Sequence, residues 1–119
     1  AFPELPFEIA VTLLTRIISK PGQNRFCIDL GYKSVASEMP ISERLCLVGM
    51  PEAEIISHSE EHMVISSTAT AGLHIGQPLL AFPRHVCPTM ALHDSAAVIR
   101  DGRVTSQRWA VTARDRLRV

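Results

Sequence analysis

The sequence has no excess of charge of either sign. Its 12 Lys and Arg residues are balanced by 12 Asp and Glu residues, which removes the basic surface typical of proteins that bind nucleic acids or anionic membranes. No apolar run approaches the roughly 20 residues of a membrane-spanning helix, and no basic stretch followed by a hydrophobic core marks a signal peptide. We therefore expect a soluble protein whose partners include neither nucleic acid nor membrane.

Several catalytic signatures are also missing. The sequence contains no glycine-rich phosphate loop, no G-x-S-x-G nucleophile elbow and no C-x-x-C pair. It therefore gives no evidence for the kinds of chemistry that these motifs serve. Its three cysteines are an odd number in a chain long enough to build a core without disulfides. A reducing, cytoplasmic location is the simplest interpretation.

The composition is that of an ordinary globular domain. The 119 residues are 46% apolar and 20% charged, which suits a single domain with a real core. The chain starts as AFPELPFEIA, without an initiator methionine, and enters an apolar run within a few residues. We expect it to be a piece of a longer protein.

Short apolar runs separated by turn signals predict the fold. Runs at residues 8–22 and 24–35 indicate a hairpin joined by a turn at residues 21–24, and residues 45–50 and 53–67 add three more strand-like runs. Residues 77–94 contain three prolines, which predict an extended or irregular segment rather than a helix. A last hairpin at residues 96–114 turns at Asp101-Gly102, a pair suited to a type I′ turn. These runs predict an all-β fold, a barrel or a sandwich, with room for a short helix near Ser42.

One ten-residue stretch, HVCPTMALHD, concentrates groups that bind metals. His85 and Cys87 are two positions apart and would share a face on an extended backbone. Imidazole nitrogen and thiolate sulfur together suit zinc, and a two-ligand site leaves positions open for a substrate oxygen. His93 and Asp94 are local candidates for further ligands or supporting contacts. Taken alone, such a pair is more often a core cysteine beside a surface histidine than a metal site.

Two other stretches combine charged groups. SEEH, residues 59–62, offers the two carboxylates Glu60 and Glu61 beside His62, although a charged hairpin tip has the same composition. DLGYK, residues 29–33, places Asp29 and Lys33 around a glycine, as many turns do. Neither stretch defines a site by itself.

Taken in order, these stretches resemble a known family. DLGYK, SEEH, PRHVCPT with LHD, and a closing DGRV with WAVTAR are similar to the C-terminal domain of the D-serine dehydratase and D-threonine aldolase family, over residues 7–114. The resemblance implies that residues 1–119 are the C-terminal, β-barrel-like domain of an alanine-racemase-like enzyme whose N-terminal α/β barrel lies outside this chain. That barrel would carry pyridoxal phosphate on a lysine that neither Lys20 nor Lys33 matches.

The resemblance also implies a function and a site. In this family the H-x-C pair binds a divalent metal beside the cofactor, so His85 and Cys87 become metal ligands, and the thiolate favours zinc. Further contacts to the substrate or to the ligands are expected from Asp29, Lys33, Glu60, Glu61, His62 and Asp94. The implied parent is a homodimeric lyase that either dehydrates D-serine or cleaves D-threonine, and the isolated domain would be inactive. The alternatives are a non-catalytic β module for dimerisation or ligand binding, and a domain of an amino-acid racemase.

Overall fold

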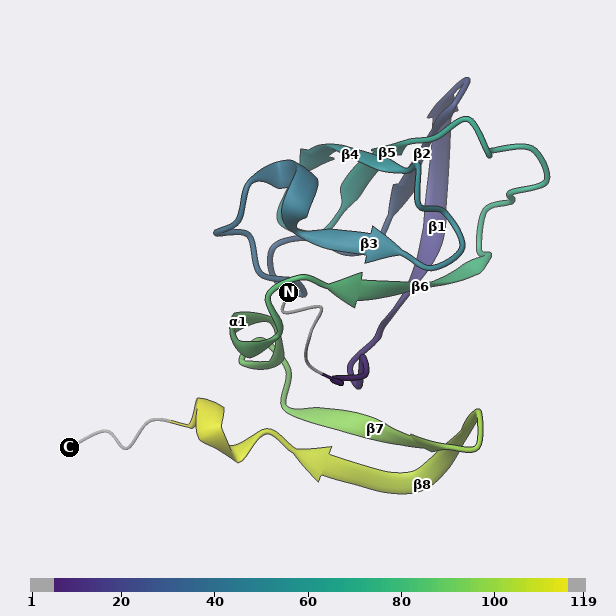
Figure 1. Cartoon of the computed structure of the whole chain (residues 1–119). Coiled ribbons are helices and arrows are strands. Elements are labelled where there is room, and N and C mark those ends of the chain that lie inside the picture. The colour runs from purple at the N-terminus through teal and green to yellow at the C-terminus, as the bar shows by residue number, and fades with distance from the viewer. Residues whose placement is uncertain (1–5, 116–119) are drawn as a thin grey trace.

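The structure is a computed structural model that describes residues 6–115. Strands make up most of its regular structure, and the helical elements are short (Figure 1). The elements follow in the order β1 (Leu13–Gly22), β2 (Arg25–Ile28), the 3₁₀ helix η1 (Ile41–Glu43), β3 (Leu45–Leu47), β4 (Glu54–His58), β5 (Met63–Ser66), β6 (Pro78–Pro83), α1 (Val86–Met90), β7 (Ser95–Arg100), β8 (Arg103–Ala110) and the 3₁₀ helix η2 (Thr112–Arg114). Within residues 6–115, no helix is both long enough and apolar enough to cross a membrane.

Six of the strands form one antiparallel sheet in the order β3-β6-β1-β2-β5-β4. The sheet curls into a half-barrel, while β7 and β8 form a separate hairpin that follows α1 (Figure 1). The predicted all-β, barrel-like fold is therefore confirmed. The assignment of residues 1–119 to one domain stays a prediction, and residues 1–5 and 116–119 lie outside the described part of the chain.

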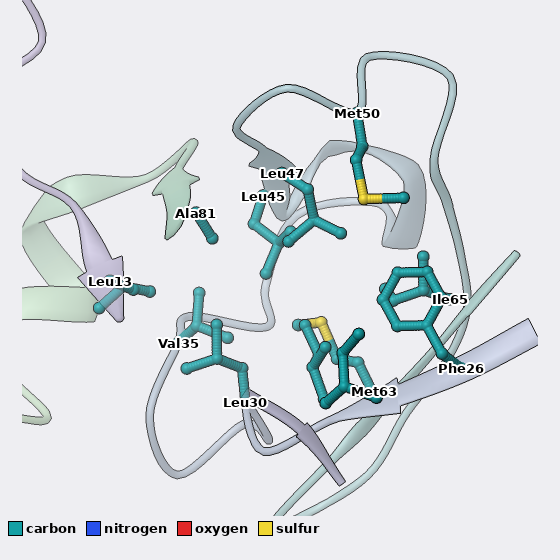
Figure 2. Packing of buried hydrophobic residues seen from close by; sticks show 12 residues of the cluster. Leu13, Phe26, Leu30, Val35, Leu45, Leu47, Met50, Met63, Ile65 and Ala81 are labelled. Atoms are coloured by element: carbon teal, nitrogen blue, oxygen red, sulfur yellow. The ribbon is translucent and has the colours of Figure 1, made fainter. Parts of the chain in front are cut away.

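The core lies inside the curl of the sheet. Along β1, Leu13, Thr15 and Ile17 are buried while the residues between them are exposed, as the period of two in a strand requires. Figure 2 shows the buried side chains gathered together, with Met50 reaching in from the loop after β3. The cluster consists of Leu13, Ile17, Phe26, Ile28, Leu30, Val35, Leu45, Leu47, Met50, Met63, Ile65 and Ala81.

The two predicted hairpin turns had different outcomes. Asp101 and Gly102 both have positive φ, 50° and 72°, which confirms the type I′ prediction. The first turn lies later than predicted, because β1 continues through Gly22 and Asn24 takes the positive φ of 58°. Pro21 fits in a strand here because this end of β1 pairs with β2 alone, beside a register shift.

The extended or irregular structure predicted for residues 77–94 is correct except at Val86–Met90. After His85 the chain enters the helix α1, which contains Pro88. A proline in the first turn of a helix costs little, because the backbone N–H groups there have no partner within the helix. The prediction failed because it treated Pro88 as a helix breaker.

Candidate functional site

His85 and Cys87 lie where β6 gives way to α1. His85 is the residue before the helix, with extended backbone angles, and Cys87 lies in the first helical turn. The Cys87 thiol is free and exposed, and the His85 side chain is 48% exposed. Neither residue is part of the core, so both side chains are accessible to a ligand.

His85 is paired with Glu38, a residue that the sequence did not single out. The imidazole Nδ1 of His85 and the carboxylate Oε1 of Glu38 form a hydrogen bond. A hydrogen bond from its own backbone N–H, followed by the His85 contact, lowers the pKa of the Glu38 carboxyl group. Because an ionised carboxylate only accepts hydrogen bonds, Nδ1 is the donor and carries the proton.

Thr89 holds the Glu38 loop against α1. Its side chain is fully buried, and Oγ1 donates to the His85 carbonyl oxygen at 2.8 Å and accepts the Ala36 N–H at 3.1 Å. A ring nitrogen of His93, Nε2, donates to the Ser34 carbonyl oxygen at 2.8 Å. The bonds of Ala36 and Ser34 fasten this loop to residues 89–93, next to the His85–Glu38 pair.

The predicted supporting residues near α1 have other partners. The contact from His93 to Ser34 is with the backbone, and Asp94 pairs with Arg114 through its side chain and accepts the Val111 N–H at 2.8 Å through its carbonyl. Within residues 6–115, no three His, Cys, Asp or Glu side chains are grouped so that they could hold a metal ion. The assignment of His85 and Cys87 as metal ligands stays a prediction.

The structure brings DLGYK and SEEH together. Lys33 Nζ lies 3.0 Å from Glu60 Oε2 and 2.7 Å from Glu61 Oε1, and its backbone N–H donates to the Glu60 carbonyl at 3.2 Å. Hydrogen bonds to Glu61 and Glu60 raise the pKa of Lys33. Within this cluster, His62 contributes its carbonyl oxygen, which accepts the Ser59 N–H at 2.9 Å.

Asp29 belongs to a different contact. Its carboxylate accepts from the Thr15 hydroxyl at 2.6 Å and the Arg16 N–H at 2.9 Å, and it pairs with Arg16 Nε at 3.2 Å. These bonds fix the end of β2 against β1. Asp29 therefore has a structural explanation within the sheet.

His58 is a second residue that the sequence left unassigned. It is half-buried at the end of β4, where its Nδ1 lies 2.9 Å from a guanidinium nitrogen of Arg44 and its ring meets Tyr32 edge to face, with centroids 6.0 Å apart. Burial, with a smaller contribution from the Arg44 charge, lowers the pKa of His58. Because Arg44 is always charged and only donates, Nδ1 must be the acceptor.

Comparison with known proteins identifies the family. Residues 10–99 match the family model described as "Putative serine dehydratase domain". The chain belongs to this family. The resemblance seen in the sequence is confirmed, and the match covers the DLGYK, SEEH and HVCPT stretches of this serine dehydratase domain.

Relatives of known name place the domain within larger enzymes. It is 33% identical over 111 residues to a D-threonine aldolase of an Arthrobacter species, covering 92% of this chain and 28% of the relative. The crystal structure of D-threonine aldolase from Filomicrobium marinum has a TM-score of 0.81 at 25% identity, covering 94% of this chain and 30% of that one. The chain therefore spans less than a third of the aldolases that it matches.

A shorter relative differs. The domain is also 33% identical over 116 residues to an uncharacterised protein of Mycobacterium tuberculosis, covering 92% of this chain and 86% of that protein. In this case the matching region makes up most of the relative.

Proposed function

We propose that this chain is the C-terminal, metal-binding domain of a pyridoxal-phosphate-dependent lyase that acts on D-3-hydroxy amino acids. The observation that carries the proposal is the His85–Glu38 pair beside the exposed thiol of Cys87. It is supported by relatives named D-threonine aldolase and 3-hydroxy-D-aspartate aldolase, the latter 30% identical over 110 residues. The reaction would be loss of water from a substrate such as D-serine or aldol cleavage of one such as D-threonine.

The donor set fits a divalent metal, with zinc favoured. With Nδ1 of His85 committed to Glu38, the other ring nitrogen has a lone pair for a metal, and a Cys87 thiolate is a soft ligand that zinc prefers. A metal bound there would supply Lewis-acid polarisation of the substrate hydroxyl. Support comes from a structural neighbour, D-threo-3-hydroxyaspartate dehydratase, for which a histidine-to-alanine variant and a metal-free cysteine-to-alanine variant are known, at positions two apart.

The lysines of this chain do not fit a covalently bound pyridoxal phosphate. Lys20 Nζ donates to the Leu73 carbonyl at 2.8 Å, and Lys33 Nζ lies between two carboxylates. When bound by another part of the enzyme, the cofactor would supply an electron sink for a carbanion. We therefore propose that an N-terminal barrel domain holds the cofactor. We also propose that the whole protein is a cytoplasmic homodimer.

A second candidate is a β module that binds a ligand or a partner without catalysis. The mycobacterial relative favours it, since this chain spans 86% of that protein and leaves little length for a barrel. Metal content and turnover of the full-length protein separate the two candidates.

The test uses the full-length protein and three variants. His85→Ala and Cys87→Ala should lose bound metal, measured by elemental analysis, and lower the turnover of D-serine or D-threonine at least about tenfold. The cofactor absorbance should be unchanged, because the substitutions lie outside the part that holds it. His74→Ala, at an exposed histidine away from α1, is the control. Unchanged turnover and metal content in both variants would favour the view that His85 and Cys87 have no ligand role.

A further inference from the structure

The contact between Glu38 and His85 stabilises the fold too little for stability to be its main role. The two side chains are 47% and 48% exposed, and a polar contact this accessible to water contributes little to stability. Yet two further hydrogen bonds, from the Ala36 N–H to Thr89 Oγ1 and from His93 Nε2 to the Ser34 carbonyl, join the same two segments and bring the two groups together. The arrangement fixes the position of the imidazole ring more than it strengthens the fold.

The hydrogen bond to Glu38 determines which ring nitrogen of His85 is available to bind a metal. The carboxylate of Glu38 can only accept, so the proton of a neutral His85 ring stays on Nδ1. The lone pair of the neutral ring is then on Nε2, on the far side of the ring. A histidine that donates its other N–H to a carboxylate is held in one tautomer and is a more basic metal ligand.

We infer that Glu38 is a positioning residue, which orients His85 so that Nε2 is presented to a divalent metal shared with Cys87. This inference rests on the proposed function and assigns to it a residue outside the H-x-C pair. The buried Thr89 hydroxyl, bound to the His85 carbonyl and the Ala36 N–H, sets the distance between the Glu38 loop and the start of α1.

The chain offers a graded series of substitutions at this position. In Glu38→Gln the amide oxygen can still accept from Nδ1 without a charge, whereas Glu38→Ala removes the acceptor. Glu43→Gln is the matched control, since Glu43 is an exposed glutamate in the same connector. His85→Ala reports the loss of the ligand itself.

The measurement is the Zn²⁺ dissociation constant of each full-length variant without substrate, by competition with a chromophoric chelator. We expect Glu38→Ala to weaken zinc binding about 10- to 100-fold, Glu38→Gln to recover part of this loss, and Glu43→Gln to match the wild type. The thermal unfolding midpoint of Glu38→Ala should equal that of the wild type, because the pair is exposed.

The outcomes separate this inference from the proposed function. If the wild type binds zinc and His85→Ala abolishes binding, but Glu38→Ala binds as tightly as the wild type, the positioning role is wrong and the metal site stands. If the wild type binds no zinc, or His85→Ala binds it normally, the proposed metal site is wrong and the role of Glu38 fails with it. An equal loss in Glu38→Ala and Glu38→Gln, together with a lowered unfolding midpoint, would show a merely structural residue.

Discussion

Gly31 lies so close to the backbone of Glu60 that a Cβ at position 31 would be 1.9 Å from the Glu60 carbonyl oxygen. The backbone atoms of Glu60 cannot move aside independently, because the Tyr32 and Lys33 N–H groups donate to the Ser59 and Glu60 carbonyls. Glycine at this position therefore lets the DLGYK and SEEH stretches meet.

Gly31→Ala should destabilise the fold by about 1–3 kcal/mol, because the added methyl group forces the two segments apart. Urea denaturation of the purified protein gives the free energy of unfolding. Gly22→Ala is the control, since a Cβ at Gly22 meets nothing within 4 Å. Equal stability of the two variants would mean that the contact at Gly31 relaxes without cost.

Thr89→Val should lower the free energy of unfolding by about 1–3 kcal/mol, because it leaves the buried N–H of Ala36 without an acceptor. Thr89→Ser keeps the hydroxyl and should retain most of the stability. The exposed Thr68 provides a control, and Thr68→Val should change the stability by no more than about 0.5 kcal/mol. Thermal and urea unfolding would both report a loss confined to Thr89→Val.

The pKa of His58 is lowered by burial in the folded protein, so the unfolded chain takes up a proton at higher pH than the folded chain does. The contribution of His58 to stability is therefore complete above its unfolded pKa of about 6.5 and is lost as the pH falls below that value. His58→Gln removes the titrating group, so the free energy of unfolding should depend less on pH between about 7.5 and 5.5. Parallel pH profiles for the variant and the wild type would contradict this assignment.

The 119-residue chain alone should bind no pyridoxal phosphate and should turn over neither D-serine nor D-threonine. Both lysines are engaged in other bonds, and carbanion chemistry at an amino acid depends on the cofactor. Cofactor titration followed by absorbance, with a substrate assay, checks both statements. A stoichiometric cofactor band in this chain would contradict them.

The local features of the fold were predictable, and the contacts between distant segments were not. The pair Asp101-Gly102 predicted its turn correctly, because few residue types adopt a positive φ at both central positions of a turn. Glu38 and Thr89 were missed because their partners His85 and Ala36 lie 47 and 53 positions away. No periodicity or spacing in the sequence relates residues so far apart. Glu38 therefore looked like an ordinary charged residue in a polar connector. His85 and Cys87 could be singled out because they lie two positions apart in the chain and match the H-x-C pair of the family.

The two outer strands of the six-stranded sheet determine how copies of this protein can associate. An edge strand with free backbone groups can pair with another chain, and proteins limit this with short strands or with a covering helix. Here β3 has only three residues, and η1 packs beside β4. Extension of the sheet from one molecule into the next is therefore disfavoured. The exposed Val104 and Trp109 of the β7–β8 hairpin instead supply apolar side-chain area for association.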